Sequence, residues 1–200
     1  GRAARRGLPW VRAWGWAVTA RKSEANRGRA WEHELDGVHA LYRGRGVYVE
    51  ANPRRWRILR HVPGGMLCVP EAQSPPDYTA LADGVPLLFD AKSCKATGKA
   101  PPRWPYEKLE LHQAEAFDRW ERNVGRAFVL LRMDDQRGFP VGRWLLPWAN
   151  LRERWDRGVV RVGPQERGTA SLQVVEADEI GVRLDSADWL GAALDLWGAP

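Results

Sequence analysis

Two aspartates and a lysine near the middle of the chain are the side chains best suited to catalysis. Asp77, Asp90 and Lys92 form the pattern P-D-x₁₂-D-x-K. Alternate side chains of a β-strand point to the same face of a sheet, so Asp90 and Lys92 are expected to lie together. Ala91, between them, is expected to turn into the packing.

A tight turn between the two aspartates explains how they can meet. Asp83 and Gly84 form an Asp-Gly pair, a strong hairpin signal, between two β-like runs. The hairpin is expected to bring Asp77 back beside Asp90. Asp83 itself is explained by its place in the turn and is not expected to take part in catalysis.

Two converging carboxylates and a lysine are suited to metal-dependent phosphodiester hydrolysis. Mg²⁺ is usually held by one or two carboxylates together with substrate phosphate oxygens, and Asp77 and Asp90 are the predicted ligands (for Mg²⁺ or Mn²⁺). Such a cation polarises the phosphoryl group and stabilises the leaving oxygen. Lys92 is expected to orient the attacking water or help to deprotonate it, and to stabilise negative charge on the phosphate.

A helix upstream of the hairpin offers a further carboxylate. The spacing of apolar residues predicts a helix over residues 23–43, which Ser23 can cap and which Gly44 ends. Glu32 lies on this helix, away from most of the apolar stripe, and is expected to complete the site directly or through water. Glu34 is an alternative, but it faces another side of the helix.

The charge balance points to a polyanionic partner. The net charge is +6 at pH 7, and 26 of the 31 basic residues are arginines, whose planar guanidinium groups suit phosphate. A GC-rich genome would produce the same arginine bias. Most of the twelve tryptophans are expected to be core or interface residues. Lys95 and Arg103, in a predicted exposed loop over residues 93–104, are candidate phosphate contacts.

Further β-like runs and helical patterns predict an α/β protein. The segment over residues 52–76 is rich in proline, arginine and glycine and is expected to protrude. Beyond about residue 158 the patterning weakens into short hairpin-like pieces before a terminal helix near Asp185. The predicted elements are the strands 47–50, 56–59, 66–69, 78–82, 85–91, 126–133 and 142–146 and a helix over 106–123.

Several other classes of protein are not supported. Cys68 and Cys94 form no CxxC pair, and the four histidines show no zinc-ligand spacing. No apolar run reaches the roughly 18 residues that suggest a membrane-spanning helix. The chain also lacks a nucleotide-binding loop, so no nucleotide cofactor is implied. Neither a signal peptide nor a membrane association is expected, and a cytoplasmic location is the default.

The motif resembles that of the PD-(D/E)-x-K, restriction-endonuclease-like nucleases, and the surrounding residues resemble the RecU-type Holliday junction resolvases. The resemblance begins with R-G-x₃-E, which includes Arg27 and Glu32, and resumes through the catalytic hairpin. There Asp90 stands where the family more often has glutamate. It continues as P-x₃-L-x₂-H-Q, which ends in His112-Gln113, and more loosely through Trp155 to the terminal helix.

This resemblance implies a fold and a catalytic set. The fold would be a restriction-endonuclease-like core, with a mixed, largely antiparallel central sheet flanked by helices and a protruding stalk hairpin. The catalytic residues would be Glu32, Asp77, Asp90 and Lys92. Gln113 would support the site or position DNA, whereas His112 is interpreted as a structural histidine.

The resemblance also implies a substrate and an assembly. A homodimer would nick opposing strands of a four-way DNA junction and leave 5′-phosphate and 3′-hydroxyl ends, in a bacterial or phage-infected cell. Residues 1–22 would form a basic arm and residues 23–200 the nuclease domain, with 158–200 as a C-terminal extension. Segment 52–76 takes the place of the stalk, and it is shorter than is usual in the family. The candidate DNA contacts beyond the catalytic loop are Arg27, Arg54, Arg55, Arg57 and Arg60.

Two alternatives remain open at this stage. One is another nuclease of the same fold that cuts ordinary duplex or flaps. The other is a basic DNA-binding or architectural module that keeps the fold without catalysis. For segment 52–76 alone, a solvated hairpin that only carries charge is a further alternative. Comparing the cleavage of a four-way junction with that of linear duplex distinguishes a junction resolvase from another nuclease. Metal-dependent cleavage by the intact protein distinguishes a nuclease from a DNA-binding module without catalysis.

Overall fold

The computed structural model describes residues 30–198, except 54–55, 64, 71–74 and 161–169. The predicted basic arm and the residues Arg27, Arg54 and Arg55 lie outside the described residues. No helix within the described ranges is long and apolar enough to cross a membrane.

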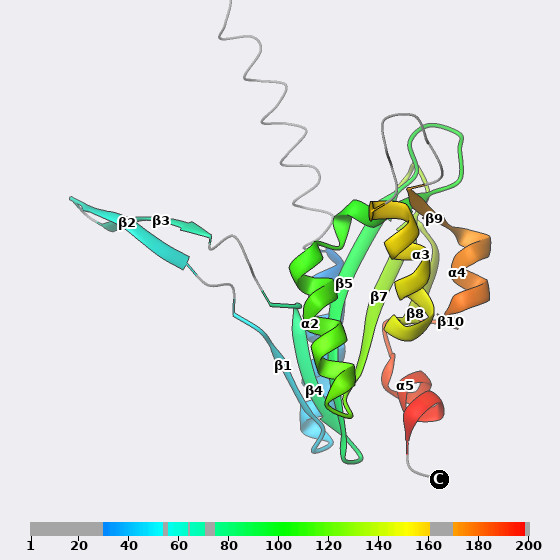
Figure 1. Cartoon of the computed structure of the whole chain (residues 1–200), viewed down its shortest axis with the longest axis horizontal. Helices are drawn as coiled ribbons and strands as arrows, with labels where there is room; N and C mark the ends of the chain where they lie inside the picture. Colours follow the sequence, from blue (N-terminus) through cyan, green and yellow to red (C-terminus); the bar gives the residue numbers. More distant parts are fainter. Residues whose placement is uncertain (1–29, 54–55, 64, 71–74, 161–169, 199–200) are drawn as a thin grey trace, which may run out of the picture.

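A mixed six-stranded sheet forms the centre of the molecule (Figure 1). The strands β5 and β7 are parallel, and every other neighbouring pair is antiparallel. This arrangement confirms the predicted α/β fold with a mixed, largely antiparallel sheet. In spatial order the strands are β1 (Tyr48–Ala51), β4 (Tyr78–Ala82), β5 (Val85–Lys95), β7 (Arg126–Asp134), β8 (Pro140–Pro147) and β10 (Val182–Leu184).

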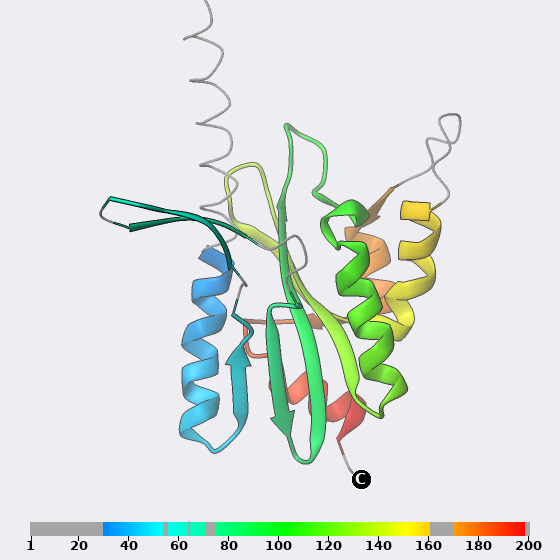
Figure 2. The same cartoon turned by 60° about the vertical axis from the view of Figure 1, so that its left-hand side comes forward.

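Helices cover both faces of this sheet (Figure 2). One face packs against α2 (Leu111–Arg122), α3 (Trp148–Val160) and α4 (Val174–Ile180). The opposite face packs against the helix over residues 30–44 and against α5 (Leu190–Trp197). The central strand β7 is therefore buried on both sides, which explains its continuous apolar run.

A two-stranded hairpin projects from this body (Figure 1). It consists of β2 (Trp56–Val62) and β3 (Gly65–Pro70), which pair with each other and not with the central sheet. Ile58 and Met66 are exposed on it, since none of the helices that the structure describes covers the hairpin (Figure 1). The predicted protruding hairpin is confirmed for β2 and β3, whereas Asn52, at the start of segment 52–76, is hydrogen-bonded to Pro76 and Thr79 beside the central sheet (Figure 1).

Two predicted boundaries around strand β5 are wrong. Residues 93–95 continue strand β5 because they pair with β7 as far as the partners Lys95 and Asp134, so the loop begins only at residue 96. A short strand β6 (Arg103–Pro105) follows and pairs with β9 (Ser171–Gln173).

The helix predicted over residues 106–123 is also interrupted. Residues Tyr106–Lys108 form a 3₁₀ turn, Leu109 is extended, and α2 begins only at Leu111. The helix α3 was not predicted. It packs through Trp148 and Trp155, whose indole groups bind acceptors on other elements, and such tertiary contacts leave little trace in the local pattern.

Candidate active site

The β4–β5 hairpin brings the two predicted aspartates together. Asp83 and Gly84 occupy its turn with φ values of +48° and +78°, as a tight turn of this kind requires. The strands pair so that Tyr78 lies opposite Phe89. This register places Asp77 beside Asp90 and confirms the structural interpretation of Asp83.

Each aspartate binds the backbone of the other strand. The backbone N–H of Asp77 donates to Oδ1 of Asp90 (3.1 Å), and the N–H of Ala91 donates to Oδ2 of Asp77 (3.0 Å). These reciprocal bonds hold the two carboxylates side by side at the start of β4. Ala91 packs toward the core on the other face, as predicted.

The proximity of the two carboxylates affects the pKa of Asp77. Burial, followed by the charge of Asp90 and a hydrogen bond to it, raises the pKa of Asp77 well above its ordinary value. The ammonium of Lys92 and the Ala91 N–H oppose this rise only in part. Two adjacent carboxylates, of which Asp90 is completely buried, with one ammonium therefore make a site that favours further positive charge.

Lys92 shares a face of β5 with Asp90 and forms an ion pair with its Oδ2. Burial by itself would lower the pKa of Lys92, but the charges of Asp90 and Asp77 outweigh burial and raise it. The raised pKa favours the ammonium form of Lys92, which can bind an anion or orient water.

Gln113 joins the catalytic strand to helix α2. Its Nε2 donates to Oδ1 of Asp90 (3.2 Å), and its Oε1 accepts from Nζ of Lys92 (3.3 Å) and from the backbone N–H of Glu110 (3.1 Å). Only 7% of Gln113 is exposed. The sequence indicated a supporting residue, and the signal for its position was the E-x-x-Q spacing of a capping box that begins at Glu110.

Glu32 is less closely associated with this group. Burial raises the pKa of Tyr78, and so do the charges of Asp36, Asp77, Glu32 and Asp90, in that order. Glu32 thus shares the electrostatic surroundings of the site. However, no three acidic, histidine or cysteine side chains among the described residues come close enough together to form a ready metal-binding group.

The alternative residue Glu34 is occupied elsewhere. Its carboxylate binds Arg132 (2.8 Å) on β7 and Arg143 (2.7 Å) on β8. Arg132 in turn binds Asp134 (2.8 Å). Glu34 therefore ties its helix to the sheet, and this contact accounts for the residue without a catalytic role. His112, on the first turn of α2, lies 3.3 Å from Glu110.

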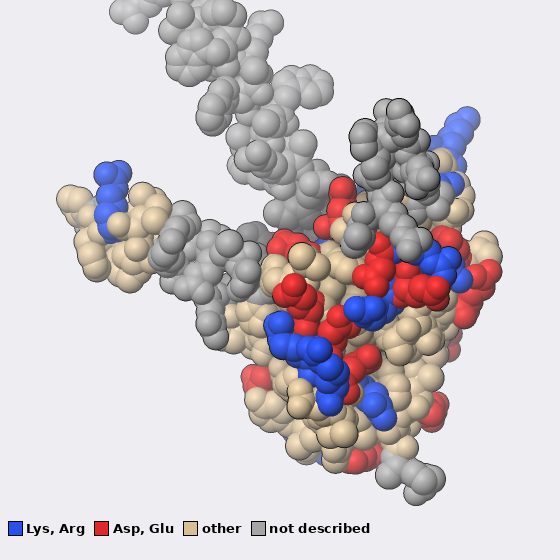
Figure 3. Space-filling view, in the orientation of Figure 1, with Lys and Arg blue, Asp and Glu red and all other residues tan. Residues whose placement is uncertain are grey.

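The face that α2, α3 and α4 cover is not a broad basic surface. Acidic and basic side chains are interspersed on it (Figure 3). Arg152 binds Asp118 (2.8 Å), and Arg154 binds Glu176 (3.4 Å) and Glu179 (3.0 Å). These paired charges are typical of a solvated surface, so phosphate contacts are better sought elsewhere.

A groove of about 630 Å³ begins beside Lys92. One wall is the end of β5 and the loop after it, and the other is β6 and the 3₁₀ turn that follows. The sequence predicted Lys95 and Arg103 as phosphate contacts, and both line this groove. Lys108, which was not predicted, lines it as well.

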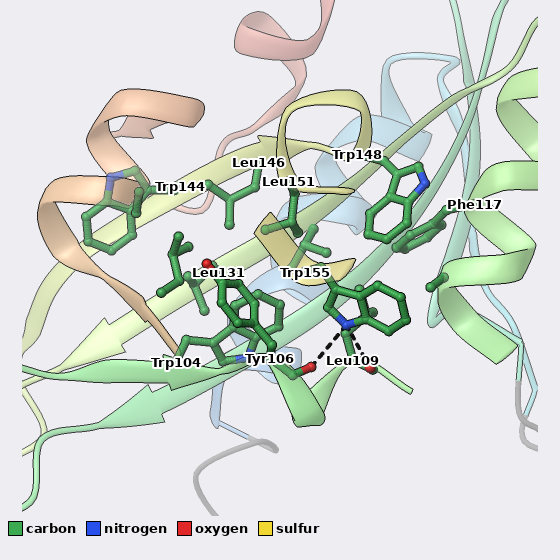
Figure 4. Packing of buried hydrophobic residues seen from close by; sticks show 14 of the residues in the cluster. Trp104, Tyr106, Leu109, Phe117, Leu131, Trp144, Leu146, Trp148, Leu151 and Trp155 are labelled. Atoms are coloured by element: carbon green, nitrogen blue, oxygen red, sulfur yellow. Dashed lines mark hydrogen bonds between the residues drawn. The ribbon is translucent and has the colours of Figure 1, made fainter. Parts of the chain in front are cut away.

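The second wall of this groove is held by helix α3 (Figure 4). The indole N–H of Trp155 donates to the backbone carbonyl oxygens of Tyr106 and Leu109, each at 3.1 Å. Trp104 is fully buried in the same cluster. The backbone of this wall is therefore held in position by side chains of the hydrophobic core.

Two further predicted DNA contacts, Arg57 and Arg60, lie on the projecting hairpin. The backbone of Arg57 is in β2, and Arg60 on the same strand is exposed. The sequence therefore predicted the location of these residues correctly, on an element separate from the catalytic sheet.

The comparisons with known proteins agree with this geometry. The family model described as Recombination protein U matches residues 26–187, which include the hairpin, Glu32 and Gln113. No curated protein matches the sequence. Because the family model spans most of the chain, the chain belongs to the RecU family of Holliday junction resolvases.

Proposed function

We propose that this nuclease cuts four-way DNA junctions by metal-dependent hydrolysis, with Asp77, Asp90 and Lys92 at the centre of each active site. The observation that carries the proposal is the carboxylate pair, hydrogen-bonded across the β4–β5 hairpin, with Asp90 buried and bound to a single lysine. In a chain of the RecU family, this group of side chains is the best candidate for catalysing phosphodiester hydrolysis.

The residues present fit a hard divalent cation, Mg²⁺ or Mn²⁺. Asp77 and Asp90 supply oxygen ligands of the kind that such ions prefer. Oδ2 of Asp90 is buried and makes no hydrogen bond within the described part of the chain, apart from its ion pair with Lys92. A bound cation would polarise the scissile phosphoryl group and stabilise the leaving oxygen.

The protein's own residues would bind and orient the reacting groups. Lys92, held as an ammonium, would bind a phosphate oxygen and orient the attacking water. Gln113 fixes the carboxylate of Asp90 and the ammonium of Lys92 in relation to each other. We assign Glu32 a supporting role through water, since it shares the electrostatic surroundings of the site without joining the carboxylate pair.

The DNA would follow the groove beside Lys92 and reach the projecting hairpin. Lys95 and Arg103 line the groove and are suited to phosphate oxygens of the cleaved strand. Arg57 and Arg60 lie on the hairpin, with Arg54, Arg55 and Arg27 as further candidate contacts. We propose a homodimer because two symmetric sites suit the two opposing strands of a junction.

Cleavage of matched substrates tests this proposal. A mobile four-way junction and a linear duplex of the same length and composition would be incubated with the protein, with and without Mg²⁺ or Mn²⁺. We expect paired nicks in the junction only when the cation is present. Preferential cutting of the duplex would refute junction selectivity, and equal cutting in the presence of a chelator would refute metal dependence.

A further inference from the structure

The two oxygens of the Asp90 carboxylate have different partners. Oδ1 accepts hydrogen bonds from the Asp77 backbone N–H and from Gln113 Nε2, at 3.1 and 3.2 Å. Oδ2 has no hydrogen bond to the residues that the structure describes, and its partner is the ammonium of Lys92. Because Asp90 is completely buried, Oδ2 depends on that single positive charge.

The ammonium of Lys92 has a second partner within reach. Oε1 of Gln113 lies 3.3 Å from Nζ. The same Oε1 accepts the backbone N–H of Glu110, so the amide cannot turn over without breaking the start of α2. Gln113 therefore presents a fixed, uncharged acceptor to Lys92.

We propose that Lys92 and the divalent cation compete for Oδ2 of Asp90, and that Gln113 is the positioning residue that holds the ammonium while the cation is bound. This inference rests on the metal dependence proposed above. Two positive charges at one carboxylate oxygen repel each other. The amide oxygen of Gln113 carries no net charge and already accepts the Glu110 N–H, so it can hold Lys92 while attracting the cation less strongly than a carboxylate does.

The competition has an unusual consequence for metal affinity. Removing Lys92 frees Oδ2, so the cation should bind more tightly although the lysine needed for hydrolysis is lost. Removing the amide of Gln113 leaves Lys92 on Asp90, so the cation should bind more weakly. The second effect operates only through Lys92.

Calorimetric titration of Mn²⁺ into the DNA-free full-length chain measures these affinities. We expect Lys92→Met to bind Mn²⁺ about tenfold more tightly than the wild type, within the range of coupling between neighbouring groups. Gln113→Met should bind it severalfold more weakly. Lys95→Met, which removes the same charge from the neighbouring groove, should leave the affinity unchanged.

The double variant Lys92→Met/Gln113→Met separates positioning from a merely structural role. If Gln113 acts through Lys92, its substitution has no effect on Mn²⁺ affinity once Lys92 is absent. If Gln113 only supports Asp90 through Oδ1, the same weakening appears in both backgrounds, and the inference is wrong. Lys92→Gln provides the same comparison should Lys92→Met not fold, and circular dichroism verifies folding.

Failure of this inference can be distinguished from failure of the proposed function. If the wild type cuts junctions with Mn²⁺ but Lys92→Met binds the ion no more tightly, the competition is refuted and the nuclease proposal stands. If Asp90→Asn binds Mn²⁺ as well as the wild type, Asp90 is not a ligand and both are refuted.

Discussion

A buried histidine behind the β4–β5 hairpin should make the fold sensitive to acid. His39, only 1% exposed, lies in the helix over residues 30–44. Its ring centroid is 4.8 Å from that of Tyr78 and 5.8 Å from that of Phe89. Nε2 accepts the indole N–H of Trp189 at 3.0 Å. An indole can only donate, so this bond requires neutral His39 with its proton on Nδ1.

Burial, and secondarily the charge of Arg43, lowers the pKa of His39 to about 4. In the unfolded chain the same group titrates near 6.5. The folded pKa is depressed, so the stability from neutral His39 is complete above about pH 6.5 and is lost as the pH falls to about 4. A difference of about 2.5 pH units corresponds to roughly 3 kcal/mol of unfolding free energy.

Urea unfolding between pH 7 and pH 4.5 measures this contribution. His39→Gln keeps a neutral acceptor for Trp189 and should cost stability at pH 7 through poorer packing. As the pH falls below about 6.5, the unfolding free energy of His39→Gln should decrease less than that of the wild type. The difference between the two decreases should be about 1.4 kcal/mol for each pH unit. His33→Gln, at an exposed position of the same helix, should keep the full acid dependence. Equal acid dependence in His39→Gln and the wild type would refute the reasoning.

Three further predictions concern cleavage, DNA binding and packing. Asp90→Asn should abolish cleavage and leave junction binding within a few-fold of the wild type in a gel-shift assay; loss of binding would show that the residue is structural. Junction affinity should fall steeply with salt concentration, and Lys95→Ala should reduce the slope of log K against log salt by about one if that lysine binds a phosphate. Gly125→Ala should cost about 1–3 kcal/mol in urea unfolding because its Cβ would come within 2.3 Å of the Trp120 ring. Gly191→Ala, where the new Cβ meets nothing within 4 Å, should be neutral or stabilising, and an equal loss in both variants would exclude the steric explanation.

The elements that were predicted correctly are those whose structure is determined by residues close together in the sequence. The β4–β5 hairpin is determined by a two-residue turn between two β-like runs, and β4 has the predicted bounds. The end of β5 was wrong because its last residues are strand only through pairing with β7, whose partner for Lys95 is Asp134. A contact between residues so far apart in the chain has no local signal.

The helix α3 illustrates the same limit on the other side of the sheet. Its indole groups bind acceptors from distant elements: Trp148 donates to Asp118 (2.8 Å), and Trp155 donates to the backbone of Tyr106 and Leu109. These bonds and the burial of both rings stabilise a helix whose apolar stripe is narrow and whose surface is rich in arginine. Most helical stability in proteins comes from such packing rather than from propensity.

The start of α2 determines how much of the active site the sequence could predict. Asp77, Asp90 and Lys92 meet through one hairpin, so their spacing suffices. Gln113 reaches them only because the helix begins at Leu111, which makes Gln113 its third residue and lets Oε1 accept the backbone N–H of Glu110. This bond directs Nε2 toward Asp90. In a helix that began at residue 106, as the pattern suggested, the backbone N–H of residue 110 would have bonded within the helix. The amide would then have been free to turn, so a shift of a few residues in a helix start decides whether Gln113 can order the catalytic pair.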